Sequence, residues 1–123
     1  MQRPIAILYE DAQLLAIDKP AGLLSAPGRG EHNRDCAAAR IQRTHPTATI
    51  VHRLDMATSG VMLMALDAAT HRALGLAFES RRVEKTYVAL VHGCVAEDTG
   101  EITAPLAKDF SQSLPPRHQV DLE

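Results

Sequence analysis

The most constraining feature of this sequence is the run VMLMAL, from Val61 to Leu66, which contains no polar residue. A short apolar run that follows a Thr-Ser-Gly turn is typical of a strand buried on both faces. Such a strand needs partner strands on both edges and cover on both faces. The chain must therefore build a sheet in which this run is central.

Residues before this run predict two strands and a helix. The strands are expected at Ile5–Tyr9 and Leu14–Asp18, and Pro20 ends the second because proline cannot donate to a sheet ladder. A loop rich in Gly, Pro and Arg then leads to CAAARIQRTH, a helix for which Asp35 is the expected N-cap. Pro46 ends that helix.

After the apolar run, the sequence predicts a second helix and further strands. Asp67 begins the amphipathic helix DAATHRALGLAFESR. The alternation in VEKTYVALVHG predicts a strand from Val83 to His92. Two weaker strand patterns follow, in EITAPL, which Pro105 interrupts, and in the alternating His118, Val120 and Leu122. We therefore expect an α+β fold with a mixed, largely antiparallel sheet and helices on its flank.

Composition indicates a soluble intracellular protein. The 123 residues suit one domain, and a hydrophobic content of 46% is enough for a core. Two cysteines in no CxxC pair suit a reducing compartment. Neither a signal peptide nor a run of about 20 apolar residues is evident. We therefore expect a cytoplasmic protein without a membrane partner.

The distribution of charge is more informative than the net charge of −2. From Arg29 to Lys85 there are nine Lys or Arg and six Asp or Glu, whereas the remainder holds four basic and nine acidic residues. A basic middle fits a surface that faces phosphates. It fits a solvated face of mixed charge equally well.

The segment VHRLDMATSG, residues 51–60, places charged groups directly before the apolar run. In an extended backbone, Arg53 and Asp55 point to the same side while Leu54 points into the core. The two charges could form a structural ion pair at a strand end. The apolar flanks instead favour a partly desolvated pair with a function, and the hydroxyls of Thr58 and Ser59 are suited to fix the carboxylate.

Other interpretations of these residues are weaker. His52 and Asp55 match no standard spacing of metal ligands, and the six histidines are scattered. Ser59 with His52 and Asp55 has the composition of a hydrolase triad but lacks the G-x-S-x-G turn. Tyr87 fits a half-buried tyrosine on a strand as well as a catalytic one.

The nine residues from His52 to Gly60 complete the pattern H-R-L-D-x-x-T-S-G, and in this the chain resembles the RluA-type pseudouridine synthases. Three other segments are similar to that family: LLAIDKPAGLLSAPG, RRVEKTYVALVHG and PPRHQVDLE. The run RIQRTHPTATIVHRLDMATSG looks closest to the dual-specificity member, which acts on 23S ribosomal RNA and transfer RNA. The resemblance covers essentially the whole chain.

This resemblance implies a reaction and a set of residue roles. Asp55 is then the catalytic nucleophile, Arg53 helps to hold the target site open and orders the carboxylate, and Tyr87 lies against the uracil and transfers a proton. The reaction breaks the N-glycosidic bond of a uridine, turns the base and rejoins it through carbon, without a cofactor or a metal. The residues expected to contact RNA are His52, Thr58, Ser59, Lys85, Arg82 and Arg29.

The family also carries a segment of the type L-x-T-G-R-x-H-Q-x-R-x-H, whose first arginine pairs with the nucleophile, and this sequence contains none. Residues 1–123 are therefore expected to be the N-terminal portion of a catalytic domain, truncated before its C-terminal half, and to be inactive and poorly stable alone. The parent function is uridine isomerisation in stem-loops of 23S ribosomal RNA, transfer RNA or both. The alternative is a non-catalytic RNA-binding remnant.

Overall fold

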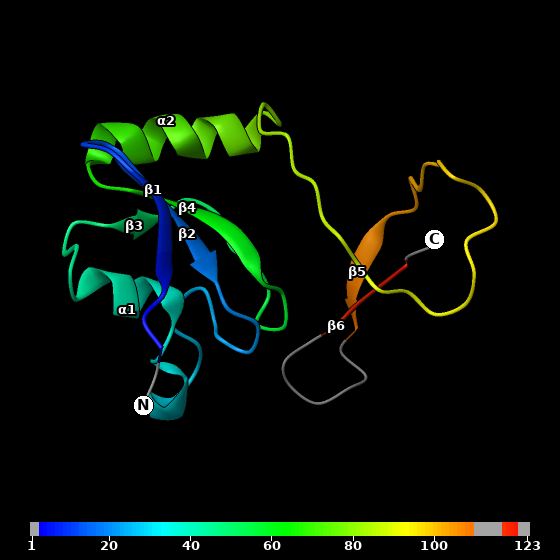
Figure 1. Cartoon of the computed structure of the whole chain (residues 1–123), viewed down its shortest axis with the longest axis horizontal. Coiled ribbons are helices and arrows are strands. Elements are labelled where there is room, and N and C mark those ends of the chain that lie inside the picture. The colour runs from blue at the N-terminus through cyan, green and yellow to red at the C-terminus, as the bar shows by residue number, and fades with distance from the viewer. Residues whose placement is uncertain (1–2, 110–116, 121–123) are drawn as a thin grey trace. The chain divides into compact units, whose positions relative to one another are not determined.

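The computed structural model of the chain describes residues 3–109 and 117–120 and divides into two units. The first unit, Met1–Thr86, contains a four-stranded sheet and two α-helices (Figure 1). The second unit, Tyr87–Glu123, contains a two-stranded sheet. Within the described ranges, no helix is long and apolar enough to cross a membrane.

The sheet of the first unit has the strand order β1-β2-β4-β3, and all neighbouring strands are antiparallel. The strand β4 (Gly60–Ala65) lies between β2 (Leu14–Lys19) and the short β3 (Thr49–Ile50), while β1 (Ala6–Glu10) forms the edge beyond β2. The predicted central strand is therefore confirmed. The two strands predicted upstream of it are also confirmed, with bounds that differ by one residue.

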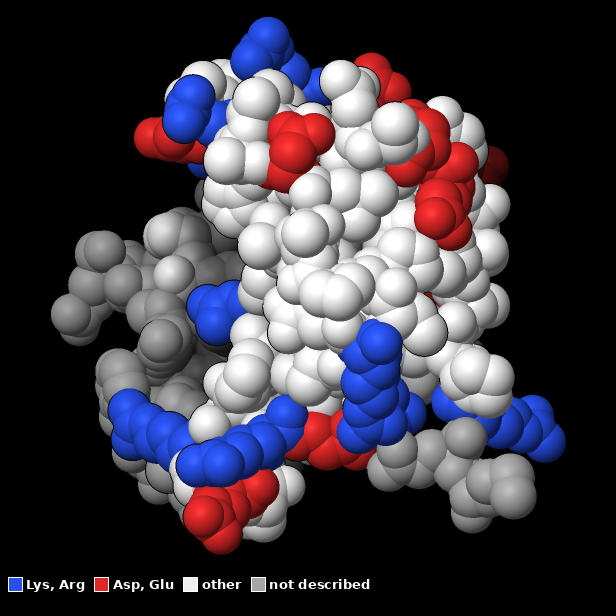
Figure 2. Space-filling model, turned by 90° about the vertical axis from the view of Figure 1, so that its left-hand side faces the viewer, with Lys and Arg blue, Asp and Glu red and all other residues white. Residues whose placement is uncertain are grey.

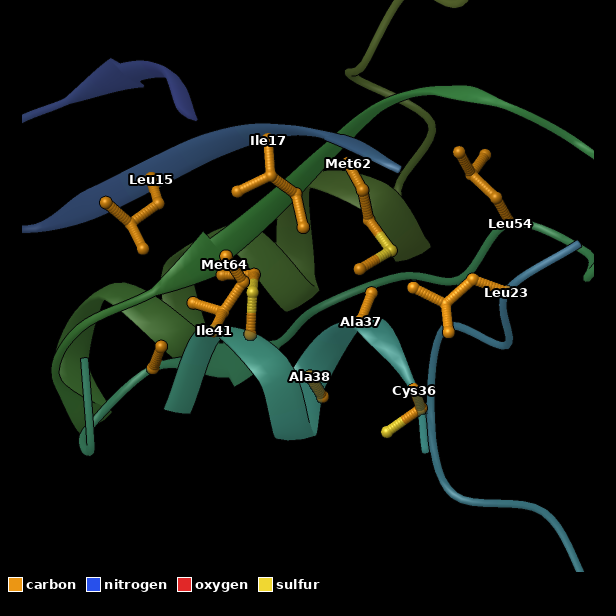
Figure 3. Packing of buried hydrophobic residues seen from close by; sticks show 11 residues of the cluster. Leu15, Ile17, Leu23, Cys36, Ala37, Ala38, Ile41, Leu54, Met62 and Met64 are labelled. Atoms are coloured by element: carbon orange, nitrogen blue, oxygen red, sulfur yellow. The ribbon is translucent and has the colours of Figure 1, made fainter. Parts of the chain in front are cut away.

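The core lies between this sheet and the helix α1 (Ala37–Gln42). Leu15 and Ile17 of β2 stand opposite Met64 and Met62 of β4, and all four side chains are fully buried. Figure 3 shows these side chains pointing toward α1, which adds the buried residues Ala37, Ala38 and Ile41. Small alanines let the helix lie close to the sheet.

The predicted N-cap of α1 is wrong by one residue. Cys36 is the N-cap, with an extended backbone, and its Sγ accepts a hydrogen bond from the Ala39 N–H at 3.3 Å. Asp35 instead receives two hydrogen bonds from the Arg40 guanidinium, at 2.7 and 2.9 Å. A bidentate arginine is a stronger partner for a carboxylate than a single helix amide. The helix also ends at Gln42, three residues before the expected end.

The second helix, α2 (Ala68–Glu79), agrees with its prediction and lies on the opposite side of the sheet from α1 (Figure 1). The carboxylate of its N-cap, Asp67, accepts a hydrogen bond from the Thr70 N–H at 2.7 Å. This contact lowers the pKa of Asp67. One face of β4 is buried, whereas its other face is only partly covered, since Val61 is 59% exposed, so the expected burial on both faces is only partly met.

The predicted strand from Val83 to His92 is wrong. Residues 80–105 contain no helix or strand, and Val88 and Leu90 are fully exposed. Alternation predicts which side chains share a face, but a strand also needs a neighbour for its backbone hydrogen bonds. Among the described residues, no strand lies alongside this segment.

The second unit contains the antiparallel pair β5 (Leu106–Asp109) and β6 (Arg117–Val120). The strand expected in EITAPL begins only after Pro105, so the prediction is wrong for residues 101–105. Proline has no N–H to donate, which explains why the pairing begins beyond it. The strand expected at His118 and Val120 is confirmed, and Leu122 lies outside the described residues.

Candidate active-site loop

The motif residues 51–59 form a loop between β3 and β4 and contain no strand. Arg53 and Asp55 are both exposed, and no ion pair joins them in the part of the chain that the structure describes. The expectation of a partly desolvated charge pair is therefore wrong. Leu54 is 7% exposed and belongs to the core, as predicted.

The backbone immediately before the Asp55 side chain is held by Ser25. The Ser25 hydroxyl donates to the Leu54 carbonyl at 2.5 Å and accepts from the Leu54 N–H at 3.0 Å. The Asp55 carbonyl itself accepts from the Thr58 N–H at 3.0 Å, which closes a turn. The hydroxyls of Thr58 and Ser59 make no hydrogen bond to the Asp55 carboxylate within the described residues, contrary to expectation.

The backbone after Asp55 is held by the loop that follows β2. The Met56 carbonyl accepts from the Gly22 N–H at 2.7 Å and from Lys19 Nζ at 3.2 Å. Gly22 has a φ of +88°, a conformation that residues with a Cβ rarely adopt. The carbonyls of residues 54, 55 and 56 each have a partner, so the carboxylate projects from a fixed backbone.

Lys19 places a buried positive charge under this loop. It is fully buried, and Nζ also donates to the carbonyls of Pro20 at 2.9 Å and Leu23 at 2.6 Å. Burial lowers the pKa of Lys19, while the negative charge of Asp55 acts in the opposite direction. The negative charge of Asp55 thus favours the charged form of Lys19.

His52 connects the loop to the sheet and to α2. Its Nε2 accepts a hydrogen bond from the Leu63 N–H at 2.9 Å, so Nδ1 carries the proton of the neutral ring. The ring stacks on Phe78, with centroids 4.3 Å apart. Burial lowers the pKa of His52, and the positive charge of Lys85 lowers it further. These contacts give His52 a structural role, and its contact with RNA stays a prediction.

The remaining predicted residues divide between the two units. Arg29, Arg82 and Lys85 are exposed in the first unit. Arg82 lies just after α2, where its Nε donates to Ser80 at 3.1 Å. Tyr87 is 60% exposed and belongs to the second unit, so its role beside Asp55 stays a prediction.

Charged side chains of both signs share the face drawn in Figure 2, mainly along its upper and lower edges, with a broad uncharged area between them. The described residues on that face therefore form no continuous basic surface. Within the described ranges, no group of three or more His, Cys, Asp or Glu is arranged to hold a metal ion.

The motif loop lies in a segment that matches a known protein family. The family model for RNA pseudouridylate synthases matches residues 13–121, which include the loop and the strands that hold it. The chain belongs to the RNA pseudouridylate synthase family. The predicted family resemblance is thereby confirmed.

Three curated members of the RNA pseudouridylate synthase family illustrate the similarity, each named dual-specificity RNA pseudouridine synthase RluA. The protein of Yersinia pestis is 48% identical over 104 residues, which are 85% of this chain and 50% of that protein. The protein of Escherichia coli K12 is 46% identical over 106 residues, 86% and 48% of the two chains. That of Vibrio parahaemolyticus is 43% identical over 104 residues, 85% and 42%. The chain spans about half the length of these relatives.

A solved structure in the comparison is Human RNA Pseudouridylate Synthase Domain Containing 4. It is 30% identical to this chain, with a TM-score of 0.48. The match covers 62% of this chain and 30% of that one.

Sequence reasoning missed two residues that hold the loop of this pseudouridylate synthase chain. Lys19 shares a strand face with Leu15 and Ile17, because residues two apart point to the same side. A lysine at a core-facing strand position was a usable signal. Ser25 offered no comparable signal, since its partner Leu54 lies 29 residues away and only the fold brings them together.

Proposed function

We propose that this protein is an RNA pseudouridine synthase that converts uridine to pseudouridine with Asp55 as the nucleophile. The family match over residues 13–121 carries the proposal, because it includes the loop that presents Asp55. The exposed carboxylate is accessible to a nucleotide, and the hydrogen bonds on both sides of it keep its backbone in one conformation. The two free cysteines support action in the reducing cytoplasm.

In the proposed reaction, the bond from uracil N1 to the sugar C1′ breaks and a bond from C5 to C1′ forms. The proton at C5 is released and N1 gains a proton, so the product is an isomer of the substrate. The carboxylate of Asp55 assists the break as an anion close to C1′ and the base. Arg53, which adjoins it on the same loop, would keep the target site open, and Tyr87 would transfer a proton.

We further propose that the substrate uridine lies in a stem-loop of 23S ribosomal RNA, transfer RNA or both. The relatives at 43% to 48% identity are named as dual-specificity RNA enzymes, which supports this choice. The uridine must leave its stack to reach Asp55, which costs a few kcal/mol and is easiest in a loop. The exposed Arg29, Arg82 and Lys85 offer positive charge for the RNA phosphates.

The decisive experiment measures tritium release from RNA stem-loops labelled at uridine C5, using the full-length product of the gene. Asp55→Asn keeps the shape of the side chain but removes the anion, so it should abolish release while RNA affinity stays within about twofold. Asp98→Asn is the control, because Asp98 is another exposed aspartate, in a segment without helix or strand. A parent protein that binds the stem-loop without forming pseudouridine would support the non-catalytic alternative.

The role of Tyr87 has a separate test. Tyr87→Phe keeps the aromatic ring and removes the hydroxyl, so it should leave RNA binding intact and slow the reaction by about 10²–10⁴-fold. The single-turnover rate, measured at saturating RNA, reports the effect. A rate within about twofold of the parent would show that the hydroxyl transfers no proton in the rate-limiting step.

A further inference from the structure

Ser25 links the helix α1 to the loop that carries Asp55. The residue is 4% exposed, and its own backbone is anchored, since its carbonyl accepts from the Ala38 N–H at 3.1 Å. The preceding carbonyl, that of Leu24, accepts from the Ala37 N–H at 2.7 Å. The hydroxyl of Ser25 therefore extends from a backbone that the first turn of α1 fixes in place.

This hydroxyl satisfies both backbone groups of Leu54. Leu54 lies outside the strands, so its N–H and carbonyl have no sheet partner, and both are bound to Ser25 Oγ. Leu54 is also buried, where an unpaired backbone group is unfavourable. Loss of the hydroxyl would leave a donor and an acceptor unsatisfied in one residue, and the loop would have to move to regain partners.

The Leu54 carbonyl belongs to the same planar peptide unit as the N–H of Asp55. The orientation of that carbonyl therefore sets the plane from which the Asp55 side chain projects. Met56 is held independently, by Gly22 and Lys19. Ser25 is thus the contact that fixes the N-terminal side of the nucleophile, 2.5 Å from the carbonyl it orients.

We propose that Ser25 is a positioning residue for Asp55, whose hydroxyl holds the Leu54–Asp55 peptide in the orientation that catalysis requires. The proposal rests on the proposed function, in which Asp55 is the nucleophile. Ser25 does not touch the substrate in this scheme and acts only through the loop backbone. Because a misplacement of about 1 Å can lower a rate about 10²-fold, a single hydrogen-bonding group is enough to matter.

The test compares Ser25→Ala with the parent in the full-length product of the gene, with kcat and KM measured on the C5-labelled stem-loop. We expect kcat to fall about 30-fold or more and KM to stay within about twofold, since the RNA-binding surface is unchanged. Thr49→Val is the matched control, because it removes a hydroxyl on β3 that bonds to His71 and not to the loop. Its kcat should remain within about twofold of the parent.

Ser25→Thr keeps the hydroxyl and is the second variant. It should retain at least tenfold more activity than Ser25→Ala, even if Ser25→Ala unfolds. A folded Ser25→Thr protein as slow as Ser25→Ala, or a Ser25→Ala protein within twofold of the parent in kcat, overturns the proposal. Equal losses of kcat in Ser25→Ala and Thr49→Val at the same stability would also overturn it.

An NMR measurement separates this proposal from the proposed function. In the full-length product of the gene, the Leu54 amide should be protected from hydrogen exchange in the parent and exposed in Ser25→Ala, with the Asp55 resonance shifted and β4 unchanged. An inactive parent protein would refute the proposed function, whereas the amide result would still decide whether Ser25 orders the loop. Unchanged Leu54 and Asp55 resonances would refute the ordering role.

Discussion

β4 and the segment from Val83 to His92 both carry strand patterns in the sequence, a continuous apolar run in one and an alternation in the other, but only β4 is a strand. β4 lies between β2 and β3, so both edges are hydrogen bonded, and two of its side chains, Met62 and Met64, are fully buried. In the other segment, by contrast, Val88 and Leu90 are fully exposed, and the described residues provide no neighbouring strand. A strand pattern therefore forms a strand only where the backbone finds partners for its hydrogen bonds.

The same difference separates the two predicted catalytic residues. Asp55 precedes β4, and the carbonyls on either side of it are bound by Ser25 and Lys19. Tyr87 lies in the segment without a strand and is 60% exposed. A catalytic group performs best when neighbouring contacts fix its position. Among the described residues, Asp55 has this support and Tyr87 has none.

Amide hydrogen exchange should show the largest contrast between the two segments. Amides of β4 exchange only when the sheet opens, whereas amides of residues 83–92 should exchange almost as fast as in an unfolded peptide. Even for a low stability of about 3 kcal/mol, the protection factors should differ by about 10². Exchange measured on the 123-residue chain tests this, and equal protection would mean that residues 83–92 have a partner in solution.

Side-chain truncation should show the next largest contrast. Met64→Ala removes a fully buried side chain and should lower the free energy of unfolding by about 3 kcal/mol. Leu90→Ala changes a fully exposed side chain and should stay within about 0.5 kcal/mol of the parent. Urea unfolding of the 123-residue chain measures both. A large loss of unfolding free energy in Leu90→Ala would show that the Leu90 side chain is packed against other residues in solution.

The comparison also shows which parts of the fold the sequence can predict. β4, β2, β1 and α2 were predictable because local patterns and the Asp67 cap determine them. The strand expected at residues 83–92 failed because pattern alone does not reveal whether a partner strand is present. The cap of α1 failed because Arg40 competes for the carboxylate of Asp35, and side-chain competition is not visible in a capping pattern.

The sequence indicated which loop carries the candidate site but not how that loop is held. The residues from His52 to Gly60 identified the loop, and the family match agrees with that identification. The sequence did not predict that the loop takes its hydrogen bonds from Ser25, Gly22 and Lys19 instead of from a neighbouring strand. Contacts between residues about 30 apart depend on the tertiary fold, so periodicity does not reveal them.

Two lysines should also differ in how much they contribute to stability, because one is buried and the other is exposed. Lys19→Met removes the ammonium group and leaves the carbonyls of Pro20 and Leu23 without this donor. The free energy of unfolding should therefore fall by about 2 kcal/mol. Lys85→Met, at an exposed lysine in the segment without a strand, should change stability by less than about 0.5 kcal/mol. Urea unfolding at neutral pH compares the two. Similar losses of unfolding free energy would show that the buried Lys19 contributes no more to stability than the exposed Lys85.

The smallest predicted effect concerns His52. Its ring stacks on Phe78 of α2, and the positive charge of Lys85 lowers its pKa. Because burial and then Lys85 lower the pKa of His52, the folded protein keeps the ring neutral as the pH falls. In the unfolded chain the ring binds a proton near its ordinary pKa of about 6.5, so acid favours unfolding. This contribution to stability is present above that pH, is lost as the pH falls below it, and levels off below the folded pKa.

His52→Gln should therefore weaken the pH dependence of stability. The side-chain carbonyl of glutamine can accept the Leu63 N–H but does not titrate, so the parent should lose up to about 1 kcal/mol more than the variant between pH 7 and pH 5. The half-buried ring is partly screened by solvent, which keeps the effect this small. The stability of Lys85→Met should depend on pH to an intermediate degree, because this variant removes the charge of Lys85 but not the burial of His52. Urea unfolding across this pH range gives the difference directly, and parallel curves for the parent and His52→Gln would mean that the ring titrates alike in the folded and unfolded states.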